Sequence, residues 1–363
     1  MKISTLLISC MLLTLSNAFG QKPVRIGIAG LSHSHVIPLL RNMDKTAYQI
    51  VGIAESDRAL VDRYAATYKI DKNMVFASLE EMLDKTKPDG VITFTSIYDH
   101  LKVVQACAPR KIHVMVEKPL AVSTKHVAKM VELSKKYGIM VLTNYETSWY
   151  PSNYAGYEMI NRGDIGVLRK IIVYDGHKGP KEINANKEFL DWLTDPVLNG
   201  GGAVIDFGCY GADLITWIRK GEKPVSVFAS LKQYKPGVYP KVDDDATILL
   251  SYPDMEGVIN ASWNWPFNRK DMHVYGSTGY LYIDNGETIR YRLNEKSKED
   301  IKKIGTNTIP FTDPFAYFAA AIRGEIIVSD TDLASLKINR IVVEILDAAR
   351  KSAKTGRAVR LKK

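Results

Sequence analysis

The sequence predicts an α/β protein in which a parallel sheet is followed by a second, large and mostly antiparallel sheet. From Val24 to Tyr145, short apolar segments alternate with amphipathic helical patterns. This alternation is typical of a parallel sheet with helices on both faces. From Val225 to Asp284, strand-like segments follow one another with little more than turns between them. Such a succession favours an open antiparallel sheet, which belongs to a second α/β domain.

The elements of the first domain follow from apolar runs and helix boundaries. Ser123 or Thr124 is expected to begin a long helix that ends at Gly138, because hydroxyl side chains cap helix starts and glycine ends helices. Strands are expected at Val24–Ala29, Tyr48–Ala54, Val75–Phe76, Gly90–Thr95, Ile112–Val116 and Ile139–Thr143. Helices are expected at about His33–Met43, Asp57–Lys69 and Glu80–Lys85.

The second half of the sequence contains mainly strand-like segments, with two helical patterns. Helices are expected at Ile205–Arg219 and Leu333–Lys354, and strands at Val167–Tyr174, Val225–Tyr234, Ala246–Tyr252, Gly257–Trp265, Met272–Tyr275 and Tyr280–Asp284. We therefore divide the chain into a leader (1–20), a first domain (21–146) and a second domain (147–363), whose C-terminal helix returns toward the first.

The leader resembles a secretory signal peptide. Lys2 precedes an apolar run from Ile3 to Leu15, and the small residues Ala18 and Gly20 stand before a cleavage position at Gln21. Such a segment is too short to span a membrane. It predicts export, with the periplasm as the expected location, and anchoring through Cys10 as a lipoprotein is the weaker alternative.

Composition narrows the function classes. The chain has 363 residues and a formal net charge of +9, and its basic residues are scattered apart from a basic tail. A nucleic-acid binder would show a basic stripe or a recognition motif, so we expect no nucleic-acid partner. Cys107 and Cys209 lie in apolar contexts and are interpreted as buried thiols. No stretch after the leader is long and apolar enough for a membrane span.

The first strand ends in Gly30-Leu31-Ser32-His33-Ser34-His35. A dinucleotide fingerprint would place glycine at 30, 32 and 35, and only Gly30 is present. Gly30 can make the tight turn, and backbone N–H groups at the helix start, with Ser32, His33 and His35, can contact phosphates. A capping or packed pair of histidines is an equally good interpretation. We expect no metal, because no third ligand lies nearby in the sequence.

Glu55 ends the second strand, 25 residues after Gly30. An acidic side chain at this place accepts a hydrogen bond from the ribose 2′-hydroxyl and repels a 2′-phosphate. It therefore favours NAD over NADP, while a solvated glutamate before a helix is the alternative.

Glu117-Lys118-Pro119 directly follows the fifth strand. Ligands collect at the carboxyl ends of parallel strands. A lysine there can hydrogen-bond a substrate hydroxyl and stabilise a developing alkoxide. The sequence therefore predicts a catalytic role for Lys118.

A third motif runs from Gly200-Gly201-Gly202 to Asp213. The glycines allow close approach of the backbone to a ligand, and the helix that follows carries Asp206, Tyr210 and Asp213 on one face. A carboxylate and a phenol one turn apart suit proton transfer from an alcohol. Helix capping by Asp206 and core packing by Tyr210 form the alternative interpretation.

In this order and spacing, these motifs resemble the Gfo/Idh/MocA family of oxidoreductases over nearly all of the chain after its leader. The resemblance implies a Rossmann domain followed by an α/β domain whose open sheet builds homodimers or homotetramers. It implies Lys118, Asp206 and Tyr210 as catalytic residues, with Lys118 raising the acidity of Tyr210. The resemblance also covers further residues expected to bind tightly held NAD, namely Thr95, Ser96, His100, Glu117 and Asn144.

Substrate contacts are expected from the second domain. His177, Lys178 and Trp192 could read the hydroxyls and the apolar face of a sugar ring, with Tyr210 beside them. The Asp243-Asp244-Asp245 run is interpreted as a solvated entry to a strand.

The leading hypothesis is therefore an NAD-dependent oxidoreductase that acts on a sugar, glycoside or polyol hydroxyl. Because free NAD is scarce outside the cytoplasm, a redox-cycling reaction such as glycoside 3-oxidation is expected. An NAD-dependent glycoside hydrolase that works through transient oxidation is the first alternative. A non-catalytic sugar-binding protein is the second.

Overall fold

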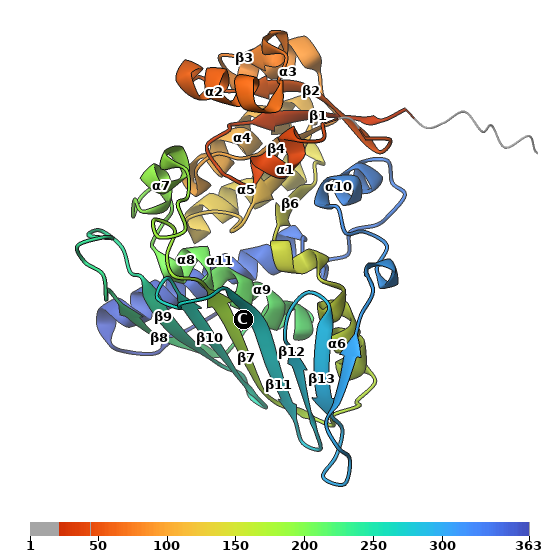
Figure 1. Cartoon of the computed structure of the whole chain (residues 1–363), viewed down its shortest axis with the longest axis vertical. Coiled ribbons are helices and arrows are strands. Elements are labelled where there is room, and N and C mark those ends of the chain that lie inside the picture. The colour runs from red at the N-terminus through yellow and green to blue at the C-terminus, as the bar shows by residue number, and fades with distance from the viewer. Residues whose placement is uncertain (1–21, 44, 363) are drawn as a thin grey trace, which may run out of the picture.

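A computed structural model describes residues 22–43 and 45–362, which fold around two sheets (Figure 1). The expected signal peptide lies outside the described residues. Within them, no helix combines the length and apolarity that crossing a membrane requires.

The first sheet confirms the predicted parallel arrangement. Its six strands lie in the order β3-β2-β1-β4-β5-β6, and every neighbouring pair is parallel. This is the strand order of a Rossmann fold. The strands are β1 Val24–Ala29, β2 Tyr48–Ala54, β3 Val75–Phe76, β4 Gly90–Thr93, β5 His113–Glu117 and β6 Val141–Asn144.

Side-chain caps fix the helices of this domain. Asp57 accepts the N–H groups of Ala59 and Leu60 at the start of α2, and Ser78 and Ser123 cap α3 and α5 in the same way. The helices are α1 Val36–Leu40, α2 Arg58–Tyr68, α3 Leu79–Thr86, α4 His100–Cys107 and α5 Thr124–Tyr137.

The first helix is shorter than expected. It begins at Val36 and not at His33, because Nδ1 of His33 accepts the N–H of His35 at 3.1 Å and holds a local turn. Such local side-chain bonds compete with the helix.

The second sheet is the predicted open, mostly antiparallel one. Its nine strands lie in the order β14-β13-β12-β11-β7-β10-β9-β8-β15, and among the described strands only β7 and β10 pair in parallel. The strands are β7 Leu168–Gly176, β8 Ser226–Lys232, β9 Asp245–Ser251, β10 Glu256–Ser262, β11 Arg269–Gly276, β12 Tyr280–Ile283, β13 Thr288–Arg292, β14 Asp300–Lys303 and β15 Val359–Arg360.

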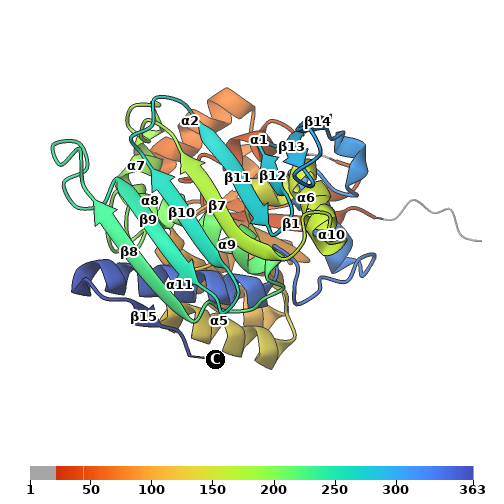
Figure 2. The same ribbon diagram turned by 90° about the horizontal axis from the view of Figure 1, so that it is seen from below.

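Helices cover one face of this sheet. Seen from below, the strands lie in front and helices α9 and α11 lie behind them (Figure 2). The single helix expected at Ile205–Arg219 is split into α8 and α9 at Phe207. The helices of this half are α6 Pro151–Asn161, α7 Lys187–Leu193, α8 Ala203–Asp206, α9 Gly208–Ile218, α10 Pro314–Ile322 and α11 Leu336–Thr355.

Two late helices connect the domains. Phe315 and Phe318 of α10 belong to the core of the first domain, and Figure 1 shows α10 (blue) beside that domain. Helix α11 contributes Val343 to the first domain and Ile345 to the second. The C-terminal segment therefore completes both cores.

Candidate active site

A cleft of about 510 Å³ opens at the carboxyl edge of the first sheet, where a Rossmann fold binds its ligand. Gly30 lines the cleft with a φ of +81°, and a Cβ at this position would lie 2.6 Å from Cγ2 of Thr95. Only glycine fits this turn. Ser32, Thr95 and Ser96 also line the cleft, as expected for cofactor-binding residues.

Glu55 occupies the end of the cleft next to β2. Its carboxylate accepts the N–H of Leu31 and the N–H of Asp57, both at 2.9 Å. The side chain is thus oriented toward the cleft by two backbone bonds. A carboxylate in this place fits the ribose of NAD and disfavours the extra phosphate of NADP.

The loop after Gly30 places its histidines in different environments. His33 is buried against the rings of Phe189 and Trp192, with ring centroids 4.6 and 5.4 Å away. Its pKa lies well below the ordinary value because of burial and then the neighbouring His35. The His35 side chain is 40% exposed, and its Nδ1 lies 2.9 Å from Oε2 of Glu117.

Glu117 lies fully buried at the end of β5. Its Oε1 accepts a hydrogen bond from Asn144 at 2.8 Å, and Asn144 in turn accepts one from Trp149 at 2.8 Å. Burial alone would raise the pKa of Glu117, but His35, Asn144 and Lys118 together hold it below the ordinary value. The site therefore contains a buried, ionised carboxylate.

Lys118 and Asp206 form a buried ion pair across the two domains. Nζ of Lys118 lies 2.5 Å from Oδ1 of Asp206, and it also donates to the Asp206 carbonyl at 3.0 Å. Trp263 donates to the other carboxylate oxygen at 2.9 Å. Burial opposes both charges, but their attraction prevails, so the pKa of Lys118 is raised and that of Asp206 is lowered.

Tyr210 lies beside this pair, and the effect of its surroundings on the phenol differs from the expected one. Lys118 and Lys270 lie over its ring, with Nζ 5.1 and 4.6 Å from the centroid. The pKa of Tyr210 lies well above the ordinary value, because the phenol is buried and Glu146 and Asp175 are near. The expectation that Tyr210 is more acidic than an ordinary tyrosine was therefore wrong, since burial raises its pKa.

A second cavity, of about 470 Å³, lies between the domains. It brings together His35 and Lys118 from the first domain with Asp206, Tyr210 and His177 from the second. His177 thus lies where a substrate contact was expected. Its pKa is lowered, mainly by burial.

Several predicted site residues lie elsewhere, and among them Glu117 and Asn144 are absent from the described residues that line the cofactor cleft. Trp192 lines the cofactor cleft and packs on His33. Lys178 is absent from the described residues that line the substrate cavity, and its carbonyl accepts from Lys235 at 2.7 Å. His100 is fully buried, with Nδ1 3.2 Å from the carbonyl of Leu120, so it contributes to the core.

The sequence reasoning missed much of the cavity wall. Lys270 pairs with Glu146, and Glu146 also accepts a hydrogen bond from Tyr150. Arg269 lies over the ring of Tyr174 at 4.0 Å. The only available signal was a basic pair at the start of β11, which resembles an ordinary exposed strand end.

The acidic run also differs from expectation. Asp243 accepts the N–H groups of Gly202 and Val204 at 2.9 and 2.7 Å. Asp244 is buried and accepts those of Tyr234 and Lys235. These two carboxylates are structural acceptors and not a solvated strand entry, because they bind backbone N–H groups of the glycine loop and of the segment after β8.

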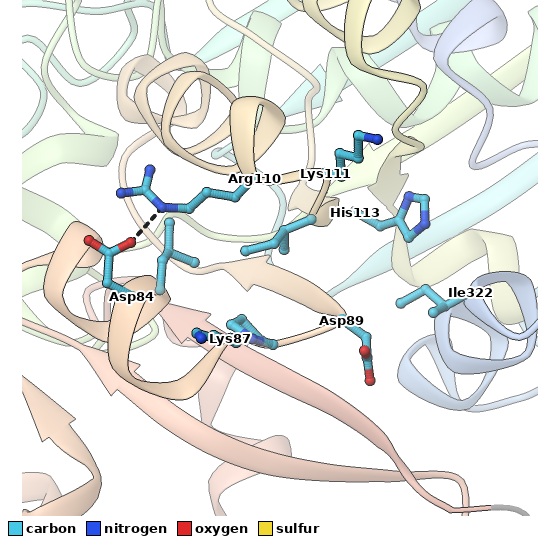
Figure 3. A pocket seen from close by; sticks show the side chains of 10 residues that line it. Asp84, Lys87, Asp89, Arg110, Lys111, His113 and Ile322 are labelled. Atoms are coloured by element: carbon cyan, nitrogen blue, oxygen red, sulfur yellow. Dashed lines mark hydrogen bonds and ion pairs between the residues drawn. The ribbon is translucent and has the colours of Figure 1, made fainter.

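The cavity of about 550 Å³ in Figure 3 lies at the opposite edge of the first sheet. Asp89 and His113, which line it, stand at the amino ends of β4 and β5. Arg110 is paired there with Asp84 at 2.8 Å. This groove is remote from Lys118, which follows the carboxyl end of β5.

Comparison with known proteins identifies both domains. Residues 24–145 match the oxidoreductase family with an NAD-binding Rossmann fold, and residues 156–282 match the GFO/IDH/MocA C-terminal domain. The chain belongs to the GFO/IDH/MocA family. Its first domain is therefore an NAD-binding domain, and the geometry of Gly30 and Glu55 fits that cofactor.

Relatives within the GFO/IDH/MocA family are distant. Trans-1,2-dihydrobenzene-1,2-diol dehydrogenase of Macaca fascicularis is 25% identical over 224 residues, which cover 62% of this chain and 63% of the relative. The match thus spans less than two thirds of that protein.

Solved structures of the same fold align over nearly the whole chain. An inositol dehydrogenase homologue from Azotobacter vinelandii with NAD⁺ has a TM-score of 0.81 at 15% identity, covering 94% of this chain and 98% of its own. Aldose-aldose oxidoreductase from Caulobacter crescentus, with glycerol, has a TM-score of 0.77 at 19% identity, covering 93% and 100%.

Proposed function

We propose that this chain transfers a hydride between NAD and a hydroxyl-bearing carbon of a sugar, glycoside or polyol. The main support is the Lys118–Asp206 pair, which stands with Tyr210 in a cavity next to the cofactor cleft. Aromatic and cationic side chains in the same wall suit the apolar face and the hydroxyls of a sugar ring. The names of the aldose and inositol relatives in structure agree with this substrate class.

The residues divide the work as follows. NAD supplies the hydride acceptor or donor. The Lys118 ammonium, oriented by Asp206, donates a hydrogen bond to the substrate oxygen and stabilises negative charge there. During oxidation the hydroxyl proton passes to the ionised oxygen of Tyr210, the hydride leaves the same carbon, and a carbonyl forms. In the reverse direction the protonated phenol returns the proton.

Retention of the cofactor forms part of the proposal. Glu188 and Trp192 of α7 line the cofactor cleft, and Glu188 pairs with Arg63 of α2 at 2.8 Å. Tyr64 donates to Glu188 and accepts from Asn186, both at 3.0 Å. Helix α7 thus ties the second domain across the cleft. Together with the proposed export to the periplasm, this favours a reaction that regenerates its own NAD, such as transient oxidation at C3 of a glycoside.

One observation favours an NAD-dependent glycoside hydrolase as the second candidate. A sugar ketone acidifies the neighbouring C–H bond, and elimination then needs a base for that proton and an acid for the leaving oxygen. The cavity holds further titratable groups for these steps, namely Glu146, whose pKa is lowered mainly through Lys270, and His177.

We also propose that the chain forms a homodimer or homotetramer through the open face of the second sheet. Half-buried aromatic side chains lie along neighbouring strands there, including Tyr174 beside His273, and Tyr282. Light scattering of the purified protein tests this, and a monomer at micromolar concentration would contradict it.

Mass spectrometry and absorbance of the molecule released on denaturation test the cofactor directly. We expect about one NAD(H) per chain. Incubation with glycosides then separates the two candidate activities, because a hydrolase releases sugar and aglycone without net NADH. A protein that contains no NAD and binds none when it is added would overturn both.

A further inference from the structure

Three side chains of metal-ligand type meet between the cofactor cleft and the substrate cavity. His33, His35 and Glu117 each offer a ligand atom, and these atoms all lie within 4.8 Å of one another. Glu117 is separated from His35 by 82 residues in the sequence. The fold therefore supplies the third ligand that the histidine pair lacks in the linear sequence.

Neither the hydride transfer nor the dinucleotide turn accounts for this cluster. The fingerprint places a glycine where His35 stands, and the imidazole projects instead to the buried Glu117. His33 occupies a closed position between the aromatic rings of α7 and the His35 ring, whose centroid is 4.3 Å away. His35 thus contacts a carboxylate to which the proposed proton and hydride transfer assigns no step, and His33 lies beside them.

We propose that His33, His35 and Glu117 bind one divalent transition-metal ion. Two imidazoles and one carboxylate form a ligand set suited to zinc and to other first-row transition ions. His35 also lines the substrate cavity, so an ion bound by it would lie at the border of that cavity. An ion held there can coordinate a substrate oxygen as a Lewis acid.

The surroundings of Glu117 support this assignment. Asn144 binds Oε1 and is itself held by Trp149, which fixes the carboxylate and leaves Oε2 directed at His35. Such outer hydrogen bonds are typical of metal ligands. The neighbouring cation, Lys118, is neutralised by Asp206, so it offers limited opposition to a second positive charge.

Ligation requires a local change at His33. Nδ1 of His33 accepts the N–H of His35, and a neutral imidazole has a single lone pair. Whichever nitrogen of His33 binds the ion, this hydrogen bond must therefore break. The bond is long, at 3.1 Å, and it joins residues two apart in the same loop. Metal binding should accordingly alter the loop that leads into α1.

Cobalt(II) titration of the purified, chelator-treated full chain tests the proposal, because the absorption of bound Co²⁺ reports its ligands. We expect one Co²⁺ per chain, displaced by Zn²⁺. The substitutions His35→Gln and Glu117→Gln should each weaken binding by at least about 100-fold, since each removes a direct ligand and loss of even an outer hydrogen-bond partner costs about 10–100-fold. His126→Gln is the matched control, because His126 lies on α5 outside the cluster.

Circular dichroism establishes that the variants fold. Glu117→Gln keeps the side-chain volume and the acceptor for Asn144, and His35 is partly exposed, so both substitutions are mild. A wild-type protein without stoichiometric Co²⁺, or binding that both variants retain, would overturn the proposal. The metal proposal and the hydride-transfer proposal can fail independently. Co²⁺ titration tests the first, and NAD content, measured by mass spectrometry, tests the second.

Discussion

The ammonium of Lys118 lies over the ring of Tyr210, 5.1 Å from its centroid, while its hydrogen bonds go to Asp206. The lysine is therefore fixed before any substrate arrives. Its ammonium and Tyr210 both line the cavity proposed for the substrate. In the proposed mechanism Lys118 and Tyr210 act on the same substrate oxygen, and each can be tested alone.

Replacing Lys118 with methionine should lower kcat/KM by about 10²–10³-fold, because charge stabilisation at the substrate oxygen is lost. It should also reduce the free energy of unfolding by about 3–5 kcal/mol, since Asp206 is left buried and unpaired. Urea unfolding and steady-state kinetics measure the two effects. Adding Asp206→Asn should recover part of the stability and none of the activity. Recovery of activity in the double variant would contradict the assignment.

Tyr210→Phe should reduce kcat by about 10²–10⁴-fold, with a smaller effect on KM, because proton transfer is lost while the ring remains. The pH profile is diagnostic. Burial, followed by Glu146 and Asp175, raises the pKa of Tyr210 well above the ordinary value. The rate of oxidation should therefore increase with pH through the alkaline range in the wild type and stay flat in the variant. An unchanged profile would assign the proton to another group.

Glu55→Gln should weaken NAD binding by about 10-fold and reduce the preference for NAD over NADP. Glutamine keeps an acceptor for the N–H of Leu31 but removes the charge that repels a 2′-phosphate. Calorimetric titration with both nucleotides measures the change. Glu80→Gln, in the same cleft, serves as control and should leave the preference intact. Equal effects in both variants would argue for a general charge effect.

Gly202→Ala should destabilise the protein by about 3 kcal/mol or more, because its Cβ would lie 1.7 Å from the backbone oxygen of Asp243. The expected result is a lower midpoint of urea unfolding. Gly237→Ala is the matched control, since nothing lies within 4 Å of its Cβ. Its effect should stay within about 0.5 kcal/mol. A tolerated Gly202→Ala would mean that the loop can move away from Asp243.

His100 makes stability depend on pH. Burial lowers the pKa of His100 from 6.5 to about 4. Between these two pH values the imidazole is protonated in the unfolded chain and neutral in the folded chain. The contribution of His100 to the free energy of unfolding is fully present above pH 6.5 and is lost as the pH falls toward 4. Between pH 7 and 5 this loss amounts to about 2 kcal/mol. The variant His100→Asn should lack this component in urea unfolding at the two values. Identical pH dependence in variant and wild type would contradict it.

Sequence patterns could predict the sheets because apolar strands and helix caps are local signals. They gave no prediction for α4, α6, α7, α10, β13 and β14. Two of these have a clear reason, because α7 has only seven residues and the four side chains of β14 are all exposed. Helix α7 and strand β14 therefore lack the long apolar pattern on which such predictions depend.

The site was only partly predictable for a different reason. Lys118 and Asp206 were identified as single residues in motifs, although they lie 88 residues apart. What the sequence could not show is the environment. Burial reverses the expected acidity of Tyr210, and the fold brings Glu117 to the histidine pair. Both effects depend on contacts between segments that are far apart in the chain, and local sequence patterns do not predict such contacts.

The late helices α10 and α11 have a consequence for the order of folding. Phe318 fills space beside Gly90 in the first sheet, and Val343 packs into the same domain. A chain emerging from a ribosome or a translocation channel lacks both until its last fifth has appeared. The NAD-binding domain would therefore stay incomplete during synthesis, and the two domains should acquire their stability together. Truncation near residue 310 would then deprive the first domain of part of its core, although its own strands are all present.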